Sequence, residues 1–192
     1  MAFTYTIEPK FLTKEECEEI LKFSLENLKL NPAEVISNHD DKIDTSGRKS
    51  NTAFYPYYRK FPFLQEKMSK LLNQYINVKG FDLDYEHSDF QFTEYNVGGY
   101  FDWHQDVYGD KITNYDRYCS LVIQLNNEYE NGDLEIKNSN DEIITVEKGI
   151  GNLILFLSDI HHRVTPVKSG VRYTLVNWVK LIEKKDYKKT LL

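Results

Sequence analysis

A histidine and an aspartate two residues apart, His104 and Asp106, are the first candidates for chemistry in this sequence. In an extended strand alternate side chains share a face, so the two donor groups would point the same way. A second histidine from another strand would complete three ligands on one side of a metal ion and leave the other side open. That set suits non-haem Fe(II) oxygen chemistry. A histidine near an aspartate on a strand is also often only a hydrogen-bonded pair.

Two adjacent histidines, His161 and His162, are candidates for the third ligand. They follow the apolar run Asn-Leu-Ile-Leu-Phe-Leu-Ser at 152–158, which is typical of a buried strand. A histidine at the end of such a core strand could reach a metal ion held by His104 and Asp106. The run itself does not distinguish the two histidines.

Arg172 adds a second chemical feature, because it begins a long apolar segment at 172–182. Both faces of a strand over this segment carry large apolar groups, so we expect the strand to be buried with Arg172 pointing inward. Burying an unpaired charge costs roughly several kcal/mol. No carboxylate of the chain is an obvious partner, so a ligand carboxylate held by the guanidinium fork is the most economical hypothesis. A structural ion pair is the alternative.

The elements that would position these residues are short strands downstream of residue 81. Glycine-containing turns separate them, and helical periodicity is absent. Consecutive strands without intervening helices favour a jelly roll or barrel over a βαβ sheet. The predicted strands cover 88–95, 100–105, 117–126, 133–137, 142–147, 152–158, 163–167 and 172–182.

The first 80 residues have a different pattern. A short strand is predicted over 3–7, and Thr13 with Glu16 forms a capping-box signature for a helix that continues to about residue 28. Pro62 begins a second helical pattern that ends near Lys79. We expect both helices to buttress the strands.

A polar segment at 31–60 lies between the two helices and reads as a loop with an embedded strand near 52–55. Loops of this length often form lids or substrate-contacting flaps. The segment contains His39-Asp40-Asp41, which could resemble a metal cluster. No periodic strand would hold these side chains rigidly, so a solvated loop is the preferred interpretation.

Composition limits the class of protein. The chain has 192 residues, of which 41% are hydrophobic and 28% charged, and this suits one globular domain over 1–192. Its expected parts are helical and loop support at 1–80, a jelly-roll core at 81–182 and a solvated tail at 183–192. The fold class predicted is therefore mainly β, a double-stranded β-helix (jelly roll) with N-terminal buttressing α-helices.

Net charge and cysteine content limit the partners and the compartment that we expect. The formal net charge of −6 argues against nucleic acid or an anionic membrane as a partner. Two cysteines, Cys17 and Cys119, make a disulfide framework improbable and indicate a reducing compartment. No leader pattern and no membrane-length apolar run occurs, so a cytoplasmic location is expected. The sequence predicts no oligomeric state.

These motifs together resemble a known family. His104-Gln-Asp106 followed by His162-Arg-Val-Thr-Pro-Val-Lys-Ser-Gly-Val-Arg172 is similar to the His-x-Asp and His-x-Val-x-Pro-Val-x-x-Gly-x-Arg signature of Fe(II)- and 2-oxoglutarate-dependent dioxygenases. The prolyl 4-hydroxylase-like branch, and within it the bacterial PKHD-type hydroxylases, looks closest. Tyr95-Asn-Val-Gly-Gly-Tyr also resembles the Tyr-x-x-Gly run that enters the metal site of that branch.

The resemblance implies roles for individual residues. His104, Asp106 and His162 would be the iron ligands, because the family register selects His162 and leaves His161 without a role. Arg172 would hold the distal carboxylate of 2-oxoglutarate. The cosubstrate pocket would be completed by Tyr95, Gln124, Leu134 and Trp178.

Two departures from the family pattern stand near this pocket. Gln124 occupies a position where some relatives have a tyrosine, and Asn131 stands where the family often has a glycine. Buried groups such as Ser120 or Asn177 could orient the iron ligands.

The activity implied is hydroxylation of a C–H bond with Fe(II), O2 and 2-oxoglutarate as cosubstrate, giving succinate and CO2, with ascorbate as a reductant. A peptidyl proline or another protein residue is the expected substrate. A free amino acid or small metabolite is the alternative. Outside this class, a noncatalytic cupin-like metal-binding module or a zinc hydrolase could use the same ligands, but neither needs the buried Arg172.

Overall fold

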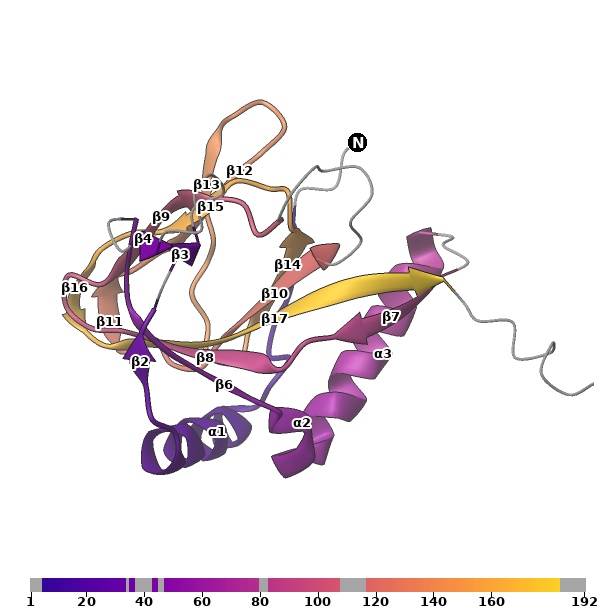
Figure 1. Ribbon diagram of the computed structural model, residues 1–192, viewed down its shortest axis with the longest axis horizontal. Coiled ribbons are helices and arrows are strands. Elements are labelled where there is room, and N and C mark those ends of the chain that lie inside the picture. The colour runs from indigo at the N-terminus through magenta and orange to yellow at the C-terminus, as the bar shows by residue number, and fades with distance from the viewer. Residues whose placement is uncertain are drawn as a thin grey trace, which may run out of the picture.

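The computed structural model describes residues 5–33, 35–36, 43–44, 47–79, 83–107 and 117–183. It contains two facing antiparallel sheets with helices along one side of the larger one (Figure 1). In chain order the elements are β1 (Tyr5–Glu8), α1 (Lys14–Asn27), β2 (Asn31–Pro32), β3 (Val35–Ile36), β4 (Ile43–Asp44), β5 (Arg48–Lys49), β6 (Asn51–Tyr55), α2 (Tyr57–Lys60), α3 (Pro62–Lys79), β7 (Leu83–His87), β8 (Phe90–Tyr95), β9 (Tyr100–His104), β10 (Cys119–Gln124), β11 (Tyr129–Asn131), β12 (Leu134–Lys137), β13 (Ile143–Thr145), β14 (Leu153–Leu157), β15 (His162–Val164), β16 (Val167–Gly170) and β17 (Arg172–Glu183).

The larger sheet has the strand order β1-β14-β10-β17-β8-β6-β2, and β7 also pairs with β17. Strands that are neighbours in this sheet lie far apart in the sequence, as a jelly roll requires. β17 is central, with β10 on one side and β8 on the other. Arg172 at its start lies opposite Tyr95 at the end of β8.

The smaller sheet has the order β13-β12-β15-β9-β5. β15 and β9 bring His162 directly opposite His104, although 57 positions separate them in the printed sequence. The register shifts between His162 and Val164, which is the signature of a bulge. Bulges commonly redirect side chains next to functional sites.

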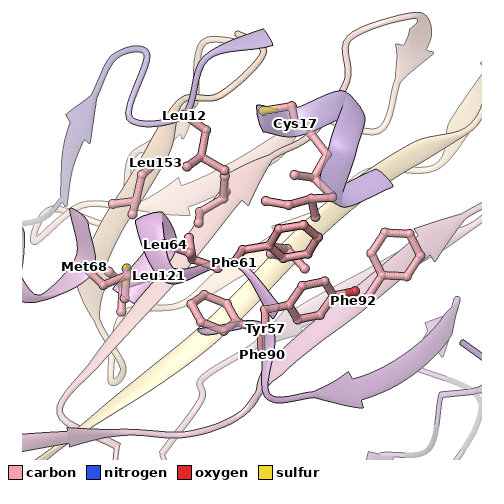
Figure 2. Packing of buried hydrophobic residues seen from close by; sticks show 14 of the residues in the cluster. Leu12, Cys17, Tyr57, Phe61, Leu64, Met68, Phe90, Phe92, Leu121 and Leu153 are labelled. Atoms are coloured by element: carbon pink, nitrogen blue, oxygen red, sulfur yellow. The ribbon is translucent and has the colours of Figure 1, made fainter. Parts of the chain in front are cut away.

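The helices bury one face of the larger sheet. α1 begins at the predicted capping box, because the Thr13 hydroxyl accepts the backbone N–H of Glu16 and the Glu16 carboxylate accepts the N–H of Thr13. Figure 2 shows how α1, α2 and α3 meet the strands through a dense set of aromatic and aliphatic side chains. Its fully buried members include Ile20, Tyr57, Phe61, Leu64, Met68, Phe90, Phe92 and Leu121.

A second core lies between the two sheets. It joins side chains of β10 and β14 in the larger sheet to side chains of β12 in the smaller sheet. Fully burying one such side chain contributes about 1.5–3 kcal/mol, so this core holds the two sheets in fixed relation. Its buried members are Val122, Leu134, Ile136, Val146, Ile154 and Phe156.

The predicted fold is confirmed as mainly β, with the double-stranded β-helix arrangement and N-terminal helices on one face. All eight predicted downstream strands form, but the one expected at 163–167 divides into β15 and β16. The sequence patterns missed β7 and β11. The second helix was predicted with its observed bounds, Pro62–Lys79.

Parts of the polar segment at 31–60 also form elements that were not predicted, namely β2, β3, β4, β5 and the short helix α2. His39-Asp40-Asp41, residues 1–4 and the tail beyond residue 183 lie outside the described residues, and the strand predicted at 3–7 is seen as β1 from Tyr5. Cys17 and Cys119 are free and buried. Among the helices described, none combines the length and apolar character needed to cross a membrane.

Candidate metal and cosubstrate site

The candidate site is a cavity of about 920 Å³ between the two sheets. His104 ends β9, Asp106 follows that strand by two residues, and His162 begins β15, so the smaller sheet supplies all three candidate ligands. Arg172 enters the same cavity from β17 of the larger sheet. The two chemical features found in the sequence therefore line one space.

The predicted ligands lie together. The Nε2 atom of His104 is 3.8 Å from Oδ1 of Asp106, and Nε2 of His162 is 3.5 Å from Oδ2 of the same carboxylate. The donor atoms of all three residues lie within 4.8 Å of one another. Two imidazoles and one carboxylate on one side of a metal ion form the 2-His-1-carboxylate facial triad that suits non-haem Fe(II).

Backbone carbonyls fix the tautomer of both histidines. Nδ1 of His104 lies 2.7 Å from the carbonyl oxygen of Asp102, and Nδ1 of His162 lies 2.9 Å from that of Ile160. A carbonyl oxygen only accepts hydrogen bonds, so each Nδ1 carries the hydrogen. The Nε2 lone pairs then face Asp106, as metal ligation requires.

His104 is held in its neutral form. Burial is the largest cause, and it lowers the pKa of His104 to about 3, with the nearby His162 and Arg48 acting in the same direction. The ring stacks on Phe101 with 3.5 Å between centroids and makes a further ring contact with His162 at 4.1 Å. A neutral, fixed imidazole can bind a cation without first losing a proton.

Asp106 is held as a carboxylate by its surroundings. Burial by itself would raise the pKa of Asp106, but the two imidazoles and the hydroxyl of Ser120 outweigh burial and lower it. The Ser120 hydroxyl donates to Oδ2 at 2.6 Å and also contacts the Ser158 hydroxyl at 2.9 Å. The indole N–H of Trp178 lowers this pKa by proximity, although its geometry does not reach a hydrogen bond.

Arg172 is buried, with only 1% of its surface exposed. Its guanidinium carbon lies 5.1 Å from the centre of the Tyr95 ring, and Nε and Nη2 have no hydrogen-bond partner in the described structure. A buried cation with unused donors fits a carboxylate ligand, because the planar fork binds both carboxylate oxygens at once. These residues therefore fit both an Fe(II) ion and the 2-oxoglutarate carboxylate.

The floor beneath Arg172 depends on Gly132. Its φ of +63° lies in the left-handed region, and a Cβ at this position would lie 2.8 Å from Cγ2 of Val167 and 3.4 Å from Cδ of Arg172. A side chain there would strain the backbone and press on the neighbours of the guanidinium. The preceding Asn131 also has a positive φ, of 55°, although the family often has glycine at this position.

Most of the other predicted pocket residues also reach the cavity. Tyr95, Leu134 and Trp178 line it. Gln124 does not belong to the lining, because its side-chain oxygen accepts the backbone N–H of Gly149 at 2.7 Å. His161 is exposed, whereas its neighbour His162 is buried.

Of the two residues expected to orient the ligands, Ser120 and Asn177, only Ser120 contacts one of them. Ser120 bonds directly to Asp106, whereas the Asn177 amide donates to the carbonyl of Ser88 and does not line the cavity. Alternate side chains of β17 point to opposite faces of the sheet. Trp178 faces the cavity, so its neighbour Asn177 faces away from it.

Sequence reasoning missed many cavity residues, and three of them make ring contacts at the site. Phe101 stacks on His104, Arg117 stacks over Trp178 at 4.0 Å, and Arg48 stacks over Phe101 at 4.4 Å. Arg48 stands in the polar segment 31–60, where no periodic pattern indicated the direction of any side chain. The same segment contributes Asn31, Pro32, Ala33, Thr52, Ala53 and Phe54 to the cavity wall.

Comparisons with known proteins agree with this geometry. Residues 90–180 match the family model described as the 2OG-Fe(II) oxygenase superfamily. A PKHD-type hydroxylase from Stenotrophomonas maltophilia (strain R551-3) is 31% identical over 108 residues, which cover 53% of this chain and 47% of the relative. The chain thus spans about half the length of this curated relative.

Solved structures resemble almost the whole chain. A viral collagen prolyl hydroxylase from Paramecium Bursaria Chlorella virus-1, in complex with 2OG, superposes with a TM-score of 0.70 at 19% identity and covers 92% of this chain and 96% of that chain. A Trichoplax adhaerens prolyl hydroxylase in complex with a hypoxia inducible factor peptide gives 0.69 at 16% identity, covering 100% and 89%. At these identities the likeness shows the shared fold.

Proposed function

Because the chain belongs, through residues 90–180, to the 2OG-Fe(II) oxygenase superfamily, we propose that it is an Fe(II)- and 2-oxoglutarate-dependent dioxygenase that hydroxylates a C–H bond. The observation that carries this proposal is Arg172. Its buried Nε and Nη2 groups have no hydrogen-bond partner among the described residues, and the side chain lines the same cavity as His104, Asp106 and His162. Neither a metal-storage module nor a zinc hydrolase needs such an arginine.

When bound, Fe(II) and 2-oxoglutarate supply the oxidising chemistry, in which O2 is consumed and the cosubstrate becomes succinate and CO2. The protein contributes orientation. Arg172 fixes the distal carboxylate, and the Tyr95 ring supports the guanidinium from β8. Ser120 and the two carbonyls at the imidazoles keep the three ligands aimed at one point.

Part of the cavity wall is aliphatic. Val122, Leu134, Val164 and Val176 line it, and the first two also belong to the core between the sheets. These side chains offer water no hydrogen bonds, so they exclude it from their part of the wall. Strong electrostatic interactions with the cosubstrate are expected there, because the local dielectric constant is low.

The substrate we propose is a peptidyl proline or another residue of a protein. The names of the relatives support this choice, since they are PKHD-type hydroxylases and prolyl hydroxylases, one of them solved with a peptide. The cavity also extends past the metal ligands to the exposed Phe54 on β6, which leaves room for a chain to enter. O2 is the second substrate.

The proposal is tested by turnover of purified protein with Fe(II), 2-oxoglutarate and ascorbate. We expect slow succinate formation without substrate and faster formation with a library of proline-containing peptides, of which the active members gain the mass of one oxygen atom. A parallel set of free amino acids tests the small-molecule alternative. His161→Ala serves as a control that keeps the three ligands. Absence of succinate in every sample would refute the oxygenase assignment.

A further inference from the structure

Arg48 is a cationic group of the cavity that the proposed chemistry does not use. It lies on β5 at the edge of the smaller sheet, opposite Phe101 on β9. Its guanidinium carbon is 4.4 Å from the centre of the Phe101 ring, and that ring stacks on His104. A single aromatic ring therefore separates Arg48 from a metal ligand.

The donors of Arg48 are only partly used. Nε donates to the Ser50 hydroxyl at 2.7 Å, which fixes the plane of the guanidinium, and the described residues offer the two terminal nitrogens no carboxylate partner. The side chain is half-buried and lines the cavity. An arginine fixed at Nε and resting on an aromatic ring is pre-organised to bind an anion with its terminal nitrogens.

The charges around the metal balance without Arg48. One Fe(II) ion, Asp106, Arg172 and the two carboxylates of 2-oxoglutarate together sum to zero. Among the described residues that line the cavity, Asp106 is the only carboxylate, while Arg48 and Arg117 add two positive charges. The loaded cavity therefore carries positive charge that a substrate can neutralise.

Arg48 and Arg117 differ in the contacts that they make within the protein. Arg117 stacks on Trp178 at 4.0 Å and donates to the backbone carbonyl of Asp106 at 3.3 Å, so it supports the ligand loop. Arg48 lines the cavity and stacks on the Phe101 ring, and its Nε hydrogen bond goes to Ser50 and not to a candidate metal ligand. Arg48 is thus the better candidate for direct contact with substrate.

We propose that Arg48 binds a carboxylate of the substrate and selects substrates that carry an acidic group next to the residue to be hydroxylated. The inference rests on the proposed function for the nature of the reaction. The carboxylate belongs either to an acidic side chain of a peptide or to a free amino acid.

The test is equilibrium binding under nitrogen to protein loaded with Fe(II) and 2-oxoglutarate, so that no turnover is needed. The probes are two short peptides with the same fluorescent label, one alternating Glu and Pro and the other alternating Gln and Pro. Fluorescence anisotropy gives both dissociation constants. The variants are Arg48→Gln and, as a matched control on the exposed surface of α2, Arg59→Gln.

We expect wild-type protein to bind the Glu-Pro peptide about ten-fold more tightly than the Gln-Pro peptide, as a charge-assisted pair predicts. Arg48→Gln should remove this preference, and Arg59→Gln should keep it. Displacement of the label by free glutamate assigns the carboxylate to a free amino acid, and failure to displace it assigns the carboxylate to a peptide.

Equal binding of the two peptides, no binding of the Glu-Pro peptide, or an unchanged preference in Arg48→Gln would overturn the inference. These outcomes are independent of catalysis. Failure of the proposed function appears as missing succinate, whereas failure of the inference appears as missing charge selectivity in anaerobic binding. Circular dichroism of each variant confirms that loss of binding is not loss of fold.

Discussion

Two buried charges of the cavity differ in their surroundings. Asp106 lies among two imidazoles and the Ser120 hydroxyl, whereas two nitrogens of Arg172 have no hydrogen-bond partner in the described part of the chain. Both groups are almost fully buried. The chain itself supplies the neighbours of Asp106. Arg172 needs a ligand to satisfy its hydrogen-bond donors. Asp106 is therefore placed to hold a metal ion, and Arg172 is placed to bind an anion.

The largest expected effect comes from removing the anion-binding charge. Arg172→Met should weaken 2-oxoglutarate binding about 100-fold, because truncating one partner of a buried, hydrogen-bonded charge pair leaves the other unpaired. Metal affinity should change less than about two-fold, since Arg172 is not among the three ligands. Calorimetric titration of the variant with each ligand measures both. Equal loss of the two affinities would identify Arg172 as structural.

The metal end should respond to loss of the neighbour that orients Asp106. Ser120→Ala removes the 2.6 Å hydrogen bond to Oδ2 and should lower Fe(II) affinity about ten-fold, the usual size of such an effect. Competition with a metal chelator measures it. Unlike Arg172→Met, Ser120→Ala should leave the affinity for 2-oxoglutarate unchanged once the metal site is saturated. Unchanged metal affinity would show that Ser120 only fills space.

The metal-free protein should also lose stability in acid. The pKa of His104 is lowered to about 3, so between pH 6.5 and pH 3 the unfolded chain binds a proton that the folded chain does not. The free energy of unfolding should therefore be about 1–2 kcal/mol lower at pH 5 than at pH 7, and no such loss is expected above pH 7. Urea titrations at the two pH values give the difference.

His104→Gln is the matched variant for the acid experiment, because it removes the titrating group from this site. Its stability should fall less between pH 7 and pH 5 than that of the wild type. A wild-type protein as stable at pH 5 as at pH 7 would contradict the account of a neutral, buried His104.

The smallest effect is expected at His161. This side chain is exposed and stands next to the buried His162, so His161→Ala should change Fe(II) affinity by less than about two-fold. His162→Ala should abolish tight binding in the same chelator assay. A large effect at His161 would reverse the choice between the two histidines.

Much of the architecture could be predicted because its signals are local. The capping box at Thr13, the helix at Pro62–Lys79 and the alternating strands follow from spacing within short windows. The division of 163–167 into β15 and β16 could not be predicted this way, because β15 pairs with β12 and β9, whereas β16 pairs with β11. Pairing across the sheet, rather than the local pattern, sets that boundary.

The site shows the same limit. His104 and Asp106 were identified from a two-residue spacing, and Arg172 from an inward-facing charge on a buried strand. Arg48 and Phe101 were not, because their roles arise only when β5 pairs with β9. Gln124 was assigned to the pocket by its strand position in the family pattern. Its side-chain oxygen instead accepts the backbone N–H of Gly149. Side-chain direction at strand ends and in loops depends on tertiary contacts.

The measurement that tests the central claim most directly is an anaerobic titration of Fe(II)-loaded protein with 2-oxoglutarate, followed by visible absorption. We predict a new absorption band that saturates at one cosubstrate per chain in wild-type protein and in His161→Ala, and that does not form in Asp106→Ala. An iron-loaded wild-type protein that neither binds 2-oxoglutarate nor changes its absorption would contradict the assignment of this cavity.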